Sequence, residues 1–201
     1  TGGYQKRDQA VFTVEETIKR AQELASIKQR DDVLWVGPVQ GGTFPDLVKH
    51  SARRMAEIGF DIYAIGSPTQ IMESYRFDRL VDLIATAKFN LPIEKPIHLF
   101  GAGHPSMFSL AVALGCDMFD SASYVLYAKD DRYMTGSGTR KLRDLREKIC
   151  TCPACQRFEL SEMLSLPQAE RFDLIARHNL YVCLNEIRII KEAIYEGRLW
   201  E

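Results

Sequence analysis

Short apolar segments alternate with longer segments of helical periodicity along most of this chain. Apolar runs of strand length lie at residues 33–39, 61–65, 96–100 and 117–119. Segments with apolar side chains three and four positions apart, as in amphipathic helices, lie at residues 14–28, 46–58, 76–88 and 107–114. Near-continuous apolar strands that alternate with helices are typical of a parallel sheet of βα units. The pattern therefore predicts an α/β fold.

The number of these units and the signals at their ends refine the prediction. Thr13 and Glu16 form a capping-box pattern, which predicts that the first helix begins at Val14. Four βα units within the first 120 residues suit half of a (β/α)8 TIM-type barrel better than a complete open sheet. Residues 167–197 predict one or two long helices, whose apolar stripe suits either a core or a subunit contact.

Composition excludes several classes of protein. The chain has 201 residues, the length of one domain or part of one, and a net charge of −1, which gives no global signature of nucleic-acid binding. No apolar run approaches the roughly 18 residues that span a bilayer, and the first residues lack the apolar region of a signal peptide. We therefore expect a cytoplasmic protein without a membrane partner. Basic residues gather between 129 and 146, where Lys129, Arg132 and Arg140 suit either phosphate contacts or a solvated charged loop.

Three cysteines and a histidine have the spacing of a metal site. Cys150, Cys152 and Cys155 form a C-x-C-x₂-C run, and His178 follows 23 residues after the last of them. Thiolates and imidazole bind Zn²⁺ tetrahedrally, and four such ligands close a structural site with no open position. The run predicts structural zinc, with a reactive or disulfide-bonded cysteine cluster as the alternative. A zinc hydrolase is disfavoured because four protein ligands leave no place for a catalytic water.

Glycine or polar residues follow every predicted strand. They are Gln40 with Gly41 and Gly42, then Gly66 with Ser67, then Gly101 with Gly103, and finally Asp120. In a βα barrel the active site lies at the carboxyl ends of the strands, and glycine permits close approach of the backbone to a ligand. The four strand ends together predict a polar pocket that binds a substrate.

Asp120 is the candidate catalytic residue of this pocket. It lies at the end of the fourth strand, whereas alternation turns Asp117 to the opposite face. A carboxylate at this place suits a nucleophile, a general base or a metal ligand, and the alternative is a cap of the following segment. Tyr63, Met107 and Phe119 are candidates either for apolar pocket walls or for core packing.

Several of these segments together resemble tRNA-guanine transglycosylases, in particular the archaeal type. The resemblance rests on residues 39–42, 100–105, 115–121, 127–133 and 178–181 and on the C-x-C-x₂-C run. It extends from about Asp31 to the last residue, and residues 1–30 match only loosely. The resemblance implies a partial transglycosylase catalytic domain over residues 1–201. Its βα barrel units would occupy about residues 31–148, and a zinc-binding segment with helices would occupy residues 149–201.

The resemblance also implies an activity and roles for single residues. The family exchanges a guanine of tRNA for a 7-deazaguanine base, and the archaeal type inserts 7-cyano-7-deazaguanine into the D-loop as the precursor of archaeosine. By position, Asp120 matches the nucleophile that attacks the ribose, Gln40 the amide that binds the base, and Ser67 a residue whose backbone faces the base. Cys150, Cys152, Cys155 and His178 match the four ligands of structural zinc.

The segment that the family uses for the first half of its barrel has no counterpart among these motifs. That half carries a second essential aspartate and a base-reading aspartate. We therefore expect a complementary N-terminal half-barrel, as a separate chain or as another segment, and a dimer of the completed unit. The alternative is a catalytically silent partner subunit that binds tRNA.

Overall fold

A computed structural model describes residues 5–28, 30–66 and 68–200 of the chain. The described residues form two compact units. The first unit extends to Ala102 and includes Ala111–Asp120, and the second comprises Gly103–Leu110 and the chain from Ser121 on. The placement of a barrel segment at 31–148 and a zinc segment at 149–201 stays a prediction.

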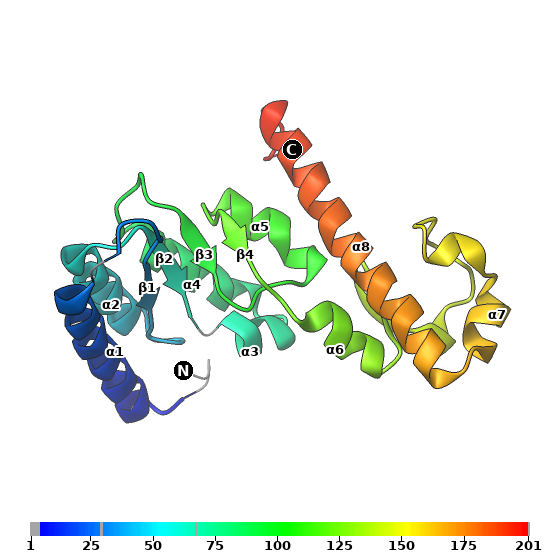
Figure 1. The fold of residues 1–201 in the computed structure, drawn as a ribbon, viewed down its shortest axis with the longest axis horizontal. Helices are drawn as coiled ribbons and strands as arrows, with labels where there is room; N and C mark the ends of the chain where they lie inside the picture. The colour runs from blue at the N-terminus through cyan, green and yellow to red at the C-terminus, as the bar shows by residue number, and fades with distance from the viewer. Residues whose placement is uncertain (1–4, 29, 67, 201) are drawn as a thin grey trace. The chain divides into compact units, whose positions relative to one another are not determined.

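A parallel sheet forms the centre of the first unit (Figure 1). Its strands are β1 (Val36–Val39), β2 (Ile62–Ile65), β3 (Ile97–Leu99) and β4 (Met118–Phe119), and they lie side by side in chain order. Neighbouring strands are parallel throughout. The predicted parallel sheet is therefore confirmed, with strands one to three residues shorter than the apolar runs, whereas its membership of a half-barrel stays a prediction.

Four of the helices in the chain's first 120 residues follow the predicted segments, with one wrong boundary, and the short helix α3 (Pro68–Glu73) was not predicted. The four are α1 (Arg7–Ile27), α2 (Pro45–Ile58), α4 (Phe77–Lys88) and α5 (Phe108–Ala113), the last preceded by the 3₁₀ turn η1 (Pro105–Met107). The Thr13 capping box is wrong, because Thr13 lies inside α1 and its hydroxyl donates to the carbonyl of Gln9 at 2.8 Å. The helix begins two turns earlier, and its face with Ala10, Val14 and Ile18 is buried.

Two aspartates connect the beginnings of the strands in the same way. The carboxylate of Asp61, just before β2, accepts the Trp35 amide at 2.8 Å, and the Asp61 amide donates to the Trp35 carbonyl. Asp117, just before β4, makes the same pair of bonds with Ile97, with its carboxylate also at 2.8 Å. Each aspartate satisfies a backbone donor at the amino end of the sheet, which secures the register of the strands. Asp117 therefore has a structural role.

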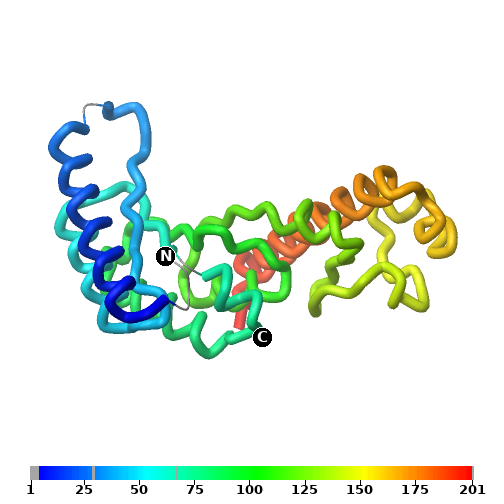
Figure 2. The backbone as a smooth tube through the Cα atoms, turned by 90° about the horizontal axis from the view of Figure 1, so that it is seen from below, coloured from blue at the N-terminus to red at the C-terminus, as the bar shows by residue number. Residues whose placement is uncertain are grey.

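The second unit combines a β-hairpin with helices (Figure 2). Its elements are α6 (Ser123–Lys129), β5 (Arg132–Thr135), β6 (Gly138–Lys141), η2 (Leu142–Asp144), η3 (Cys155–Arg157), α7 (Leu160–Ser165) and α8 (Gln168–Tyr195). The predicted tail is one continuous helix, α8, drawn in orange to red. The basic stretch is no simple loop, because β5 and β6 pair antiparallel within it.

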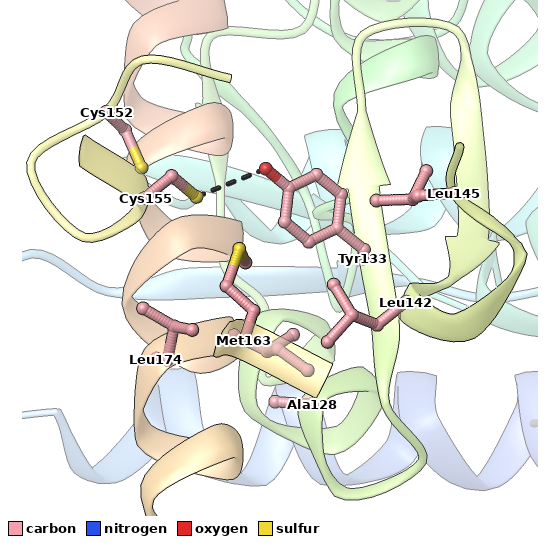
Figure 3. Close-up of a cluster of buried hydrophobic side chains, with 9 residues drawn as sticks. Ala128, Tyr133, Leu142, Leu145, Cys152, Cys155, Met163 and Leu174 are labelled. Carbon is pink, nitrogen blue, oxygen red and sulfur yellow. Dashed lines mark hydrogen bonds between the residues drawn. The ribbon is translucent and has the colours of Figure 1, made fainter. Parts of the chain in front are cut away.

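A small apolar core holds this unit together, as Figure 3 shows. Tyr133 of β5 lies among Leu142, Met163 of α7 and Ile175 of α8, all of them buried. Cys152 and Cys155 belong to the same cluster. The core therefore joins the hairpin, α7 and α8 to the segment that carries the cysteines. No helix within the described residues has the length and apolarity needed to cross a bilayer.

Candidate active site and metal centre

The four residues that follow the strands align in one row at the carboxyl edge of the sheet. The register pairs Val39 with Ile65, Ile65 with Leu99 and Leu99 with Phe119. The next position of each strand is therefore, in order, Gln40, Gly66, Phe100 and Asp120. Because side chains alternate along a strand, this row belongs to the face opposite to that of the preceding row, in which Val39, Ile65 and Leu99 are buried.

Asp120 is held at one of its two carboxylate oxygens. Its Oδ1 accepts the backbone N–H of Gly101 at 2.8 Å and lies 2.8 Å from Nε2 of His98. The side chain of Asp120 remains 50% exposed, whereas that of His98 is 17% exposed. Gly101 has a φ of 74°, a conformation that favours glycine, and this turn directs its amide at the carboxylate. A fixed, accessible carboxylate of this kind is suited to nucleophilic attack.

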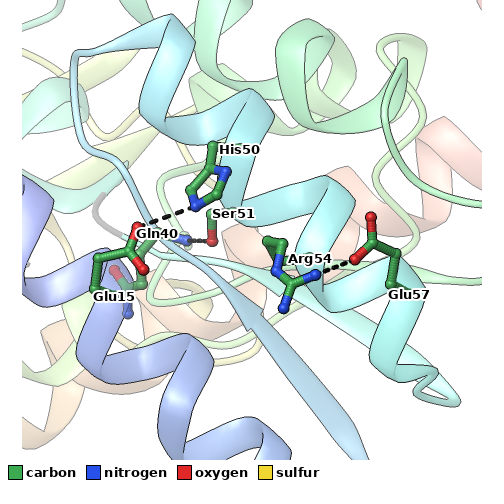
Figure 4. Close-up of polar contacts among 6 residues, drawn as sticks. All are labelled: Glu15, Gln40, His50, Ser51, Arg54 and Glu57. Atoms are coloured by element: carbon green, nitrogen blue, oxygen red, sulfur yellow. Dashed lines mark hydrogen bonds and ion pairs between the residues drawn. The ribbon is translucent and has the colours of Figure 1, made fainter.

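Gln40 is anchored through its backbone to the helix beside it (Figure 4). The N–H of Gln40 donates to the hydroxyl of Ser51 at 3.0 Å, and Ser51 is fully buried in α2. The Gln40 side chain lies over Gly66, where a Cβ atom would come within 2.8 Å of Oε1. Gly66 therefore leaves the space that the amide occupies, and the two residues form one local arrangement.

Gly41 and Gly103 each lie against another part of their own unit with no room for a side chain. A Cβ atom on Gly41 would lie 2.5 Å from the Val48 backbone nitrogen, so Gly41 allows β1 to meet α2. In the second unit, a Cβ atom on Gly103 would lie 1.8 Å from that of Ser121, and the Gly103 carbonyl accepts the Ser123 hydroxyl. Packing thus accounts for both glycines, and ligand binding by Gly103 stays a prediction. Ser67 lies outside the described residues.

The metal-site prediction concerns the second unit. Ligand atoms of Cys150, Cys152, Cys155 and His178 all lie within 4.8 Å of one another. Nδ1 of His178 is 3.6 Å from Sγ of Cys152 and 3.4 Å from Sγ of Cys155. Sulfur and nitrogen ligands of one tetrahedral zinc ion lie about 3.5 Å apart. The spacing therefore fits a zinc ion, and the five cysteines are all free rather than disulfide-bonded.

The surroundings orient these ligands. Nε2 of His178 lies 2.8 Å from the Met134 carbonyl and donates to it, which leaves Nδ1 for a metal. Hydrogen bonds with the Cys155 thiol and His178 lower the pKa of the Cys150 thiol to about 3, whereas burial raises that of Cys152. The hydrogen bond with Cys150 and burial raise the pKa of Cys155. The four residues on their own therefore favour a single thiolate, that of Cys150. Three cysteine thiolates at this spacing require a bound cation to balance their charge.

Comparison with known proteins decides the family. The family model described as queuine tRNA-ribosyltransferase matches residues 1–201. The chain belongs to this family of tRNA-guanine transglycosylases. The predicted resemblance is confirmed, and it includes the first 30 residues, which the sequence motifs had matched only loosely.

Curated relatives of this transglycosylase-family chain include archaeal proteins. It is 49% identical over 200 residues to a tRNA-guanine(15) transglycosylase of Methanocaldococcus jannaschii, covering 97% of this chain and 30% of that protein. Proteins of the same name from Methanococcus aeolicus and Aeropyrum pernix are 47% and 48% identical over 208 and 196 residues. These matches cover 100% and 97% of this chain and 32% and 38% of those proteins. The chain thus spans about a third of each relative.

Sequence reasoning missed two residues that contact the candidate site residues, His98 beside Asp120 and Tyr133 beside Cys155. His98 is a polar residue between two fully buried ones, Ile97 and Leu99, and this interruption of an apolar strand was a usable signal. Tyr133 contacts the metal-ligand candidates Cys155 and His178, but nothing in its local sequence indicates this. Of the suggested pocket walls, Tyr63 and Met107 are buried core residues, whereas Phe119 is half-buried.

Proposed function

We propose that this chain supplies the nucleophile and the base-binding edge of an enzyme that exchanges a guanine in the tRNA D-loop for 7-cyano-7-deazaguanine, as in archaeosine biosynthesis. The observation that carries the proposal is the row of Gln40, Gly66 and Asp120 at one sheet edge, in a member of the transglycosylase family. The free thiols of all five cysteines suit the reducing cytoplasm, where we place the reaction.

The proposed reaction has two half-reactions. Oδ2 of Asp120 attacks the ribose C1′ while the bond from C1′ to guanine N9 breaks, and its electron pair and a proton from solvent leave with guanine. The incoming base then attacks C1′ through its own N9, the C1′–Oδ2 bond breaks, and the proton of N9 passes to solvent. Such double displacement at an oxocarbenium-like centre uses a carboxylate nucleophile in the same way as retaining glycosidases.

One face of the parallel sheet, here called the open face, has exposed apolar side chains, which is an argument for a complementary half-barrel. Val36, Met118 and Phe100 lie on the face that also carries Asp120, and they are 41%, 42% and 57% exposed. Side chains of the opposite face, such as Val39 and Leu99, are buried. In a closed barrel the open face would become the interior, which side chains fill. We therefore propose that another chain or segment completes the barrel, and that the completed unit dimerises.

We assign zinc to Cys150, Cys152, Cys155 and His178, in a structural role. Bound zinc would hold three thiolates and an imidazole together and would stabilise the small core of the second unit. All four positions of a tetrahedral ion are then occupied by protein, so the exchange chemistry is left to Asp120.

The alternative is a catalytically silent subunit that binds tRNA and completes an assembly. One feature of the basic stretch favours an RNA contact in either case. Arg132 lies 3.7 Å over the ring of Tyr127, where its guanidinium is held beside an aromatic face. This arrangement suits a base or a phosphate of RNA. The hydrogen-bonded carboxylate of Asp120 favours the catalytic assignment.

Trapping the covalent adduct tests the proposal. The enzyme assembled from this chain and the completing half-barrel is incubated with tRNA and a competing base, denatured, and run on a gel. We expect a shifted protein–RNA band for the parent and none for Asp120→Asn, which keeps the shape of the side chain but removes its charge.

Asp117→Asn is the matched control, because Asp117 lies three residues away and its carboxylate binds the Ile97 amide at the other end of the sheet. An amide oxygen can still accept that bond, so we expect an unchanged band. Exchange at near-parent rate by Asp120→Asn would place the nucleophile elsewhere and favour the silent subunit.

A further inference from the structure

The two oxygens of the Asp120 carboxylate have different surroundings. Oδ1 accepts a hydrogen bond from the Gly101 N–H at 2.8 Å and lies 2.8 Å from Nε2 of His98. Oδ2 has no hydrogen-bond partner among residues 5–28, 30–66 and 68–200. The carboxylate is therefore held by one oxygen while the other is left for a reaction partner.

The imidazole of His98 is itself fixed in place. His98 lies in the middle of β3, and its flanking residues Ile97 and Leu99 are fully buried on the opposite face. Its ring meets the ring of Phe100 edge to face, with centroids 5.5 Å apart and planes at 69°. With a proton on Nε2, the imidazole donates to Oδ1 of Asp120. A strand and a neighbouring ring thus hold the donor.

We infer that His98 is a positioning residue for Asp120, which holds Oδ1 so that Oδ2 faces the ribose and stabilises the carboxylate as it leaves the ribosyl ester. This inference rests on the proposed function, in which Asp120 is the nucleophile. His98 reaches the reaction only through Asp120, so its role is to orient that carboxylate and to balance its charge.

The effect of this hydrogen bond differs between the two half-reactions. In the free enzyme the His98–Asp120 hydrogen bond already stabilises the charged carboxylate before it attacks. Its contribution to the attack on C1′ is therefore mainly to orient Oδ2. When the incoming base attacks C1′, the C1′–Oδ2 bond breaks and its electron pair returns to Asp120, while the N9 proton of the base passes to solvent. Negative charge then develops on both oxygens, and donors at Oδ1 stabilise it. Loss of the His98 donor therefore slows the second half-reaction most.

A pair of variants separates the hydrogen bond from the shape of the side chain. His98→Phe keeps a ring beside Phe100 but removes the donor, whereas His98→Gln retains an N–H donor. The assembled enzyme is first loaded with labelled tRNA to form the adduct, and decay of the protein–RNA band is then followed after 7-cyano-7-deazaguanine is added. We expect decay about tenfold slower for His98→Phe and close to the parent rate for His98→Gln.

His98→Ala with added imidazole provides a second measurement that does not depend on how the phenylalanine packs. Adduct decay should be slow without imidazole and should accelerate when imidazole is added. Equal decay in the parent and His98→Phe, or equally slow decay in His98→Phe and His98→Gln without rescue by imidazole, overturns the inference.

The proposed function can fail separately in the same experiment. Absence of an adduct in the parent, or its presence in Asp120→Asn, overturns the proposed function and this inference with it. A parent adduct that Asp120→Asn lacks, together with normal decay in His98→Phe, overturns only the positioning role of His98.

Discussion

The ring of Tyr133 stacks on the imidazole of His178, with centroids 3.5 Å apart and planes 13° from parallel. The Tyr133 hydroxyl also lies 3.1 Å from Sγ of Cys155, so one side chain contacts two of the four metal-ligand candidates. Burial and the neighbouring Cys155 raise the pKa of Tyr133, which keeps the hydroxyl protonated and able to donate. Tyr133 therefore orients the histidine, and its hydroxyl would donate to the Cys155 thiolate of a metal-bound site, as outer-shell residues do.

Removal of this hydroxyl should weaken metal binding without disturbing the fold. Tyr133→Phe keeps the stacked ring but loses the hydrogen bond to Cys155. We expect zinc affinity to fall by about tenfold, at the lower end of the range for outer-shell partners. Competition with a coloured chelator measures the affinity directly. Tyr195→Phe, on a side chain that is 78% exposed near the end of α8, should leave the affinity unchanged.

Removal of the metal itself should destabilise the second unit. Cys152 and Cys155 belong to its buried core, so a metal bound by them would hold that core together. We expect about one zinc ion per chain by elemental analysis. Removal of zinc with a chelator should lower the melting temperature of the protein, and added zinc should restore it. Protein that contains no zinc after preparation without chelator, yet melts at the same temperature, would contradict the assignment.

Asn179, next to His178 on α8, ties the hairpin to the helices of the second unit. Its side-chain oxygen accepts the Met134 amide at 2.9 Å, and its nitrogen donates to the carbonyls of Tyr124 and Arg132 at 3.1 and 3.0 Å. Asn179→Leu should leave these buried groups unpaired and cost about 2–4 kcal/mol. Thermal or urea unfolding measures the loss. Asn185→Leu on the same helix is the control, and an equal loss there would show that Asn179 has no special role.

The parallel sheet and the cysteine cluster could be predicted from the sequence because both depend on the spacing of residues close together in the chain. Apolar runs alone located all four strands, and the C-x-C-x₂-C run located three metal-ligand candidates. The β5–β6 hairpin was missed because Lys129, Arg132 and Arg140 were interpreted only as phosphate contacts or as a solvated charged loop. Its turn, Thr135-Gly136-Ser137-Gly138, did carry a hairpin signal in the two glycines.

The contacts that complete both sites were not accessible from the sequence, because they join distant residues. His98 and Asp120 are 22 residues apart, and Tyr133 and Cys155 are also 22 apart. Asn179 and Met134 are 45 apart. No local spacing rule encodes such pairs, since only the folded chain places them together. Only the fold brings His98 to Asp120 and Tyr133 to the metal-ligand candidates.

Acid should weaken the amino end of the sheet through Asp61. The hydrogen bond from the Trp35 amide, with help from Lys28, lowers the pKa of the Asp61 carboxyl below its ordinary value. A lowered folded-state pKa means that this stabilisation is present above the unfolded pKa of about 4 and is lost as the pH falls through the folded value. The melting temperature of Asp61→Asn should therefore decrease less than that of the parent when the pH is lowered from about 5 to 2. An identical fall in parent and variant would contradict this.

Gly66 and Gln40 should act on base binding as one unit. Gln40→Ala removes the amide and should weaken binding of guanine or a 7-deazaguanine by about 1–3 kcal/mol, the usual cost of an unpaired buried polar partner. Gly66→Ala places a Cβ atom 2.8 Å from Oε1 of Gln40 and should displace the same amide. Because both changes act through one group, the double variant should bind no more weakly than Gln40→Ala alone.

Isothermal titration of the assembled enzyme with each base measures the three affinities. Gly136→Ala is the control for a glycine substitution, because the nearest atom that a Cβ would meet there is the Glu186 carboxylate at 3.9 Å. If the effects of Gly66→Ala and Gln40→Ala added in full, Gly66 would contribute through its own backbone rather than through the amide. If neither variant changed the affinity, this edge of the sheet would not bind the base, and the anchoring of Gln40 by Ser51 would serve only the packing of β1 on α2.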